Sequence, residues 1–205
     1  MRGSVGRMCA GPGSRWLRAA CLCLGAASLA ACAPLRQPVE APTTLPQPLE
    51  QFRLEGRISV KSGEQAFSGG IRWQHDGPRD EILLTAPLGQ GVARLRREPD
   101  RVLLITAEGG EFEAVSGEAL LERVLGVRLP VEGMRYWVTG LPRPQTGYTL
   151  GWDEVGRVAR LEQDGWQLDY ARHQSQAGRW LPGRIFARRD EDLEFRLVVD
   201  AWQLP

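Results

Sequence analysis

The stretch that decides the fold is Phe52-Arg53-Leu54-Glu55-Gly56-Arg57-Ile58-Ser59-Val60-Lys61, in which apolar or small residues alternate with polar ones. Successive side chains of a β-strand point to opposite faces, so this alternation predicts a strand with one buried and one wet face. The next stretch repeats the pattern and ends in the turn residues His75-Asp76-Gly77-Pro78. Its expected buried face consists of Phe67, Gly69, Ile71 and Trp73.

Nine more segments have strand patterns, and two have helical ones. Ser116 is placed to cap a helix with apolar residues 120, 121, 124 and 125, and Gly126 is placed to end it. A second short helix is expected after Pro130, with Met134, Trp137, Val138 and Leu141 as its apolar stripe. We therefore expect one α+β domain, mainly antiparallel β, with about eleven strands and two helices. The remaining strands are expected over residues 81–86, 91–97, 101–107, 111–114, 149–152, 158–163, 166–170, 184–188 and 193–202, the last with Ala201 on its apolar face.

An antiparallel sheet of this length curls, and its apolar face needs a cover. The two central helices are the expected cover. A close fit would give an ordinary core, whereas a loose fit would leave an apolar pocket suited to acyl chains. The sequence leaves both alternatives open.

The first 50 residues predict a sorting signal and a tether. Residues 1–31 are basic and then apolar, and the apolar run 19–31 is too short to span a bilayer. Leu29-Ala30-Ala31-Cys32 resembles the lipobox of a bacterial lipoprotein, so we expect Cys32 to become the lipidated first residue. The alternative is an ordinary signal peptide cut nearby, and both Met1 and Met8 fit as the start. Five prolines predict an extended tether over 32–50, followed by the folded domain 51–205.

Charge and cysteine content narrow the class of protein. The signal segment carries four of the 26 basic residues and none of the 25 acidic ones, so its removal turns the formal net charge from +1 to −3. This balance gives no reason to expect a nucleic-acid partner. All four cysteines lie at or before Cys32, so we expect no intramolecular disulfide in the mature chain, and a monomer is the simplest expectation.

Catalytic and metal-binding patterns are missing from the sequence. The two histidines, His75 and His173, are expected at the surface, and neither a Gly-x-Ser-x-Gly nor a His-Glu-x-x-His motif occurs. Gly89-Gln90-Gly91 lacks the third glycine of a dinucleotide loop, and Asp190-Glu191-Asp192 is typical of a solvated turn. We expect no enzyme activity, no cofactor and no metal site.

An ordered series of short motifs behind the lipobox resembles the LolB family of outer-membrane lipoprotein receptors across almost the whole mature chain. The motifs are 52–60, Gly70-Ile71-Arg72-Trp73-Gln74, Leu83-Leu84-Thr85-Ala86-Pro87-Leu88-Gly89-Gln90, Tyr136-Trp137-Val138-Thr139-Gly140-Leu141-Pro142, Gly165-Trp166-Gln167-Leu168-Asp169-Tyr170, Leu181-Pro182 and Leu197-Val198-Val199-Asp200-Ala201-Trp202.

The resemblance implies an open half-barrel with helices as a lid over a hydrophobic cavity. It also implies a protein anchored in the outer membrane that faces the periplasm, accepts triacylated lipoproteins from the carrier LolA and inserts them without ATP. Ala33 after the lipidated cysteine favours sorting to that membrane. Leu88, between Pro87 and Gly89, is the expected membrane-insertion residue, unless it folds back onto the sheet.

For the acyl cavity we expect walls from six residues, each of which fits an ordinary core equally well. They are Ile71, Trp73, Leu84, Leu95, Trp137 and Phe195. Trp73 and Trp137 are favoured because an indole can line an apolar space while its N–H finds a polar partner. Two rival functions stay open: a lipoprotein scaffold of an envelope complex with a filled core, and an envelope enzyme that acts on lipid.

Overall fold

The computed structural model describes residues 44–126 and 128–205, and its main feature is one antiparallel sheet of eleven strands. The strand order is β6-β5-β4-β3-β2-β1-β13-β12-β9-β8-β7, and the outer strands β6 and β7 do not pair with each other. The sheet is therefore an open half-barrel, which confirms the expected fold class. Its strands are β1 (Gln51–Ser62), β2 (Gln65–Asp76), β3 (Arg79–Thr85), β4 (Gly91–Arg97), β5 (Val102–Thr106), β6 (Glu111–Ala114), β7 (Tyr148–Trp152), β8 (Val158–Gln163), β9 (Trp166–Ala171), β12 (Arg184–Arg189) and β13 (Leu193–Gln203).

The first and last strands join in the middle of this sheet. β1 pairs with β2 along its whole length, and on its other side it pairs with β13 from Arg53–Gln203 to Ser62–Leu193. Gly56 is needed at this seam, because a Cβ there would collide with the Val198 carbonyl oxygen. The pairing of β1 with β13 thus joins the first half of the sheet, β1 to β6, to the second half, which contains β7 to β9, β12 and β13.

A β-bulge changes the expected face of the end of β13. Glu55 lies opposite Ala201 and Gly56 opposite Val199, so Asp200 is the extra residue. The extra residue shifts the alternation, and Trp202 takes the buried position while Ala201 is only half-buried. The expectation that Ala201 lies on the buried face was wrong for this reason.

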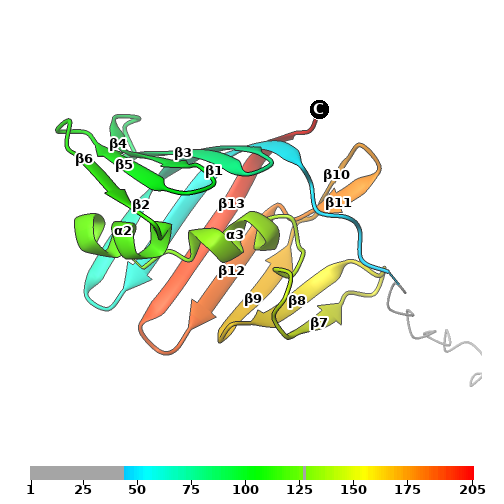
Figure 1. Ribbon diagram of the computed structural model, residues 1–205. Helices are drawn as coiled ribbons and strands as arrows, with labels where there is room; N and C mark the ends of the chain where they lie inside the picture. The colour runs from blue at the N-terminus through cyan, green and yellow to red at the C-terminus, as the bar shows by residue number, and fades with distance from the viewer. Residues whose placement is uncertain (1–43, 127) are drawn as a thin grey trace, which may run out of the picture. The chain divides into compact units, whose positions relative to one another are not determined.

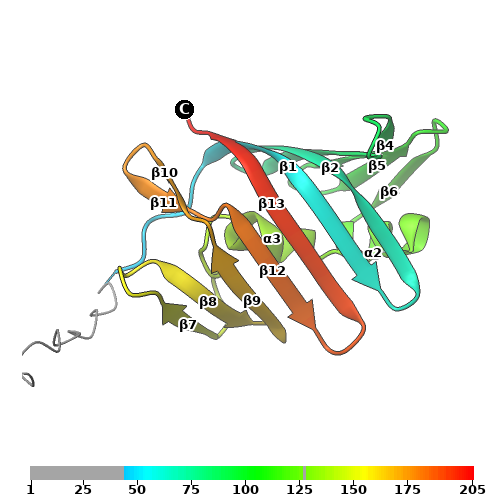
Figure 2. The same cartoon turned by 180° about the vertical axis from the view of Figure 1, so that it is seen from behind.

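Two helices lie on the same face of the sheet, and the opposite face has no helix on it in the described part of the chain (Figures 1 and 2). The first is α2 (Gly117–Leu125), where Ser116 Oγ accepts a hydrogen bond from Ala119 N and Gly126 ends the helix at φ +69°. The second is α3 (Val131–Trp137), which follows Pro130. Both confirm the positions predicted from capping residues and apolar spacing. Neither helix is long and apolar enough to cross a membrane.

A two-stranded hairpin, β10 (Gln174–Gln176) and β11 (Arg179–Leu181), was not predicted. Its turn residues Ala177 and Gly178 both have positive φ, as a type I′ hairpin turn requires. The polar sequence before the turn has no apolar alternation, so its pattern gave no strand signal.

Candidate functional site

A cavity of about 160 Å³ lies between α2 and the half-barrel. Gln65 is the one polar side chain among its wall residues. The wall comes from β1 to β4, from α2 and from the segment after α2, and consists of Ile58, Val60, Gln65, Ala66, Phe67, Leu84, Val92, Leu121, Leu125 and Leu129. A mainly apolar cavity of this volume can accept an apolar guest about as large as benzene.

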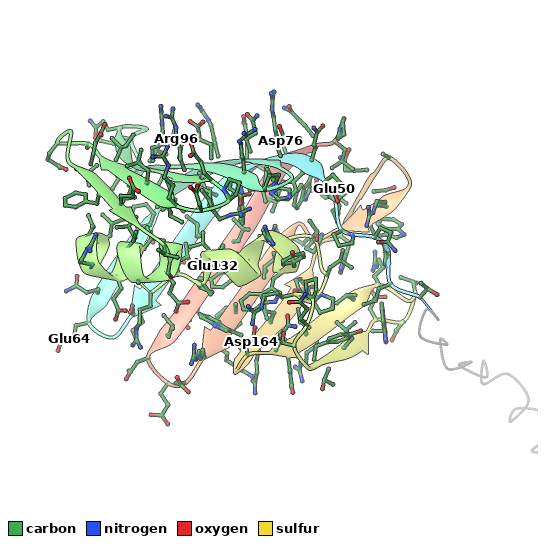
Figure 3. All side chains as sticks on the ribbon, viewed as in Figure 1. Glu50, Glu64, Asp76, Arg96, Glu132 and Asp164 are labelled. Atoms are coloured by element: carbon green, nitrogen blue, oxygen red, sulfur yellow. The ribbon has the colours of Figure 1, made fainter. Side chains whose placement is uncertain are left out.

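Helix α2 is held over this cavity mainly by apolar contacts. Leu120 and Leu121 are buried at 0% and 3% exposure. Its start is tied to α3 by one hydrogen bond, from Gly117 N to Glu132 Oε1 at 2.9 Å, and Figure 3 shows Glu132 at the end of α3 that faces α2. At its other end, a Cβ on Gly126 would lie 3.5 Å from Gln65 Cγ of β2.

Helix α3 is fixed to the sheet far more firmly. The Trp137 indole donates a hydrogen bond to Gln163 Oε1 at 2.8 Å, and that buried amide donates in turn to the Arg143 carbonyl. The Trp137 ring packs against Trp166, which packs against Phe195, with centroid distances of 6.0 and 5.5 Å. The space under α3 is therefore filled by aromatic side chains, whereas the space under α2 is hollow.

The six residues expected to line an acyl cavity are all buried in the core between the sheet and the helices. Leu84 lies in the wall of the cavity under α2. Trp137 and Phe195 belong to the aromatic packing under α3. The remaining three, Ile71, Trp73 and Leu95, are packed within the same core cluster. Sequence reasoning did not place Leu121, Leu125 or Phe67 in a cavity wall, although it expected all three on the apolar faces of their elements.

Leu88 lies at the tip of the β3–β4 connection and is 88% exposed. Gly89 N donates to the Ala86 carbonyl, and Ala86 N donates to the Gln90 carbonyl, both at 2.8 Å. These two bonds close a tight turn with Pro87 and Leu88 at its centre, where Pro87 has the fixed φ that suits this position. The turn holds an apolar side chain in solvent, away from the sheet.

A buried polar cluster surrounds Asp80 beside the core. The Trp73 indole donates to Asp80 Oδ1 at 2.9 Å, His75 Nδ1 lies 2.7 Å from the same oxygen, and Arg97 Nε donates to Oδ2 at 2.6 Å. Burial alone raises the pKa of the Asp80 carboxyl, but the hydrogen bonds from His75 and Trp73 and the charge of Arg97 outweigh it. The pKa of Asp80 is therefore held below its ordinary value.

The expectation that His75 lies at the surface was wrong, because its side chain is only 7% exposed and stacks on Phe52. β2 continues through His75, so the two-residue alternation from Ile71 and Trp73 places it on the buried face. His173 is half-buried and donates from Nε2 to the Val158 carbonyl. No group of three or more metal-binding side chains occurs among the described residues. Cys32 lies outside them.

Comparison with known proteins gives consistent results. A family model described as "Outer membrane lipoprotein LolB" matches residues 50–202. The outer-membrane lipoprotein LolB of Pseudomonas paraeruginosa is 41% identical over 155 residues, which cover 76% of this chain and 75% of that protein. The protein of the same name from Nitrosococcus oceani is 38% identical over 202 residues, which cover 93% of this chain and 99% of that protein. The crystal structure of a DUF1329 family protein from Desulfovibrio piger matches with a TM-score of 0.52 at 11% identity, over 76% of this chain and 86% of that one, which supports the fold alone.

Proposed function

The chain belongs to the LolB family of outer-membrane lipoproteins, and on this premise we propose that it is a receptor that binds lipoproteins by their acyl chains and inserts them into the outer membrane. The observation that carries the proposal is the apolar cavity under α2. A filled interior would suit a scaffold, whereas a mainly apolar space beneath a helix held by leucines suits lipid. The exposed Leu88 gives the same molecule an apolar contact with a membrane.

The size of the cavity determines how such a receptor works. At about 160 Å³ it is smaller than the roughly 300–1,000 Å³ of typical ligand pockets, so three acyl chains do not fit while α2 is in place. We propose that α2 moves away from β2 to admit them, while the hydrogen-bonded Trp137 keeps α3 on the sheet. Each CH₂ group that enters recovers about 0.8 kcal/mol, which offsets the apolar packing that the leucines of α2 give up when the helix moves.

The direction of transfer follows from affinity alone. We propose that lipoproteins arrive from the periplasmic carrier LolA, bind more tightly here, and then pass to the bilayer, where acyl chains are most stable. No nucleotide is needed for a transfer that is downhill at each step. In this scheme residues 1–31 are removed, Cys32 carries the lipid anchor, residues 32–50 connect that anchor to the domain, and 51–205 is the binding domain on the periplasmic face.

Reconstitution tests this function. The purified protein is mixed with LolA carrying a labelled triacylated lipoprotein, without nucleotide, and the label is followed by co-purification and then by flotation with liposomes. We expect the label to leave the carrier, to stay bound until liposomes are added, and then to float. A version that begins at Ala33 should accept the label in solution. Retention of the label by LolA would contradict the proposal.

The two rival functions predict other results. A scaffold with a filled core would bind no fluorescent fatty acid and would accept no label. An enzyme would turn over a lipid ester, and the turnover would fall on substitution of His173, the more accessible of the two histidines.

A further inference from the structure

A second apolar groove, of about 350 Å³, lies at the β7–β8 end of the sheet. Its walls come from the β10–β11 hairpin, from the turn between β7 and β8 and from the segment after α3. The large apolar side chains in these walls are Leu141, Trp152, Val158, Trp180 and Pro182. Trp180 is 56% exposed, which is unusual for so large an apolar side chain. The acyl cavity under α2 shares no residue with this groove.

The N-terminal end of the described chain already lies against this groove. Thr44 and Pro46 contribute to its wall, and the Arg179 guanidinium of β11 donates a hydrogen bond to the Gln47 carbonyl. The segment then runs past the hairpin and α3 to β1, as Figure 1 shows, and the Glu50 carbonyl accepts a hydrogen bond from Gly77 N at 2.7 Å. Residues 44–50 are thus attached to the domain at both ends.

The groove has the chemistry of a site for an extended proline-rich strand. Such strands dock on aromatic walls with little loss of entropy, because proline already fixes their backbone. Trp152 and Trp180 supply the aromatic faces, and the Arg157 guanidinium lies 5.2 Å from the centre of the Trp180 ring. Burial and the charge of Arg157 hold the pKa of His173, another wall residue, below its ordinary value, which favours its neutral form.

We propose that this groove binds the preceding segment of the same chain, Val39-Glu40-Ala41-Pro42-Thr43. The segment continues directly from Thr44 at the groove wall, and as a polyproline II strand its five residues span about 15 Å. Pro42 precedes Pro46 by four residues, and Glu40 complements the charge of Arg179. Because the segment is covalently joined to the groove wall at Thr44, its effective concentration at the groove is on the order of millimolar. Weak contacts are therefore enough to bind it.

The consequence concerns the tether and rests on the proposed lipidation of Cys32. From Cys32 to Thr44 the chain can extend by about 40 Å, but with 39–43 docked only residues 32–38 remain, which extend by at most about 25 Å. The groove therefore shortens the tether and holds the receptor nearer to the membrane surface.

A fluorescent label tests the docking. Ala41→Cys is introduced into the processed protein in detergent, where lipid occupies the sulfur of Cys32, and the new thiol is labelled with bimane, a dye quenched by nearby tryptophan. Glu64→Cys is the matched control, because Glu64 lies in the exposed β1–β2 turn (Figure 3). We expect quenching at position 41 and none at 64. The double variant Trp152→Phe and Trp180→Phe keeps the aromatic walls and should restore the fluorescence, whereas Arg179→Ala should restore it by releasing the segment.

Equal brightness at positions 41 and 64 in the parent protein would overturn the proposal. A second result would also overturn it: in the Ala41→Cys protein the bimane stays bright while a spin-labelled phospholipid quenches the fluorescence of Trp180. The groove would then be a lipid site. Because no carrier or cargo is present, this measurement is independent of lipoprotein transfer. Bimane found on Cys32 by mass spectrometry would show separately that Cys32 carries no lipid on its sulfur.

Discussion

Replacing Leu88 by glutamate should block delivery of lipoproteins to the membrane while leaving the fold intact. The side chain is 88% exposed, and the turn around it is closed by backbone hydrogen bonds between residues 86, 89 and 90. Substitution of an exposed side chain away from caps and special backbone positions typically changes the free energy of unfolding by about 0.5 kcal/mol or less. Cargo binding should also persist, since Leu88 is not in the wall of the cavity under α2.

The size of the effect follows from the exposed surface. Leucine has three more carbons than alanine, so at about 0.8 kcal/mol per buried carbon the Leu88→Ala loop loses roughly 2 kcal/mol of membrane contact. That corresponds to about a 30-fold weaker contact, at 1.4 kcal/mol per factor of ten. Glutamate adds the cost of bringing a charge into the bilayer, on the order of a further 2–3 kcal/mol, so Leu88→Glu should weaken the contact more than 100-fold.

The assay is transfer of a labelled lipoprotein from the receptor to liposomes, read by flotation. Val155→Glu is the matched control, because Val155 is another exposed apolar residue, 67% exposed in the β7–β8 turn, and receives the same charge. We expect normal delivery by Val155→Glu, reduced delivery by Leu88→Ala and almost none by Leu88→Glu. Delivery by Leu88→Glu at the parent rate would refute the role of Leu88, and an equal loss in both glutamate variants would refute its specificity.

Three further predictions concern the interior. A disulfide between Gln65→Cys and Gly126→Cys should fasten α2 to β2 and stop lipoprotein acceptance, and reduction with dithiothreitol should restore it; acceptance by the cross-linked protein would exclude movement of α2. Asp80→Asn should destabilise the protein at pH 7. Because the pKa of Asp80 is lower in the folded than in the unfolded protein, its ionised form stabilises the fold fully above the unfolded pKa of about 4. That stabilisation is lost as the pH falls through the lower, folded pKa. The urea midpoints of parent and variant should therefore converge in acid. Trp137→Phe removes the indole bond to Gln163 and should cost about 1–3 kcal/mol in urea unfolding without abolishing acyl binding.

Much of the fold was predictable because its elements are locally consistent. The alternation in 52–61 set both the strand and its buried face, and Ser116 and Gly126 marked the ends of α2 where the structure has them. The errors occurred where two local signals competed or where pairing decides the face. His75 has turn residues after it but belongs to the strand alternation, and the bulge at Asp200 depends on pairing with β1, which no segment of β13 encodes by itself.

The hollow under α2 was harder to predict than the sheet. Periodicity identifies which side chains face inward, but a cavity depends on how side chains from several elements add up in volume. The large aromatics Trp137, Trp166 and Phe195 fill the space under α3. Under α2 the facing side chains are mainly leucine and valine, with Phe67 only partly buried at the margin. The informative signal was therefore that aliphatic side chains lie under α2, whereas large aromatic ones lie under α3.

The unequal attachment of the two helices gives a physical basis for opening. A helix of nine residues is marginal in water by itself, so α2 owes its structure to the packing of Leu120 and Leu121 and to its caps. Its displacement therefore exposes apolar surface, and a polar guest could not compensate for that exposure. Acyl chains can, because they present to the same leucines the apolar surface that the sheet otherwise provides. The Trp137–Gln163 bond keeps α3 in place during the exchange, so the cover can open at one end without unfolding the other. On this reasoning the cargo itself stabilises the open state, which accounts for acceptance without a nucleotide and for release once the bilayer offers a larger apolar surface.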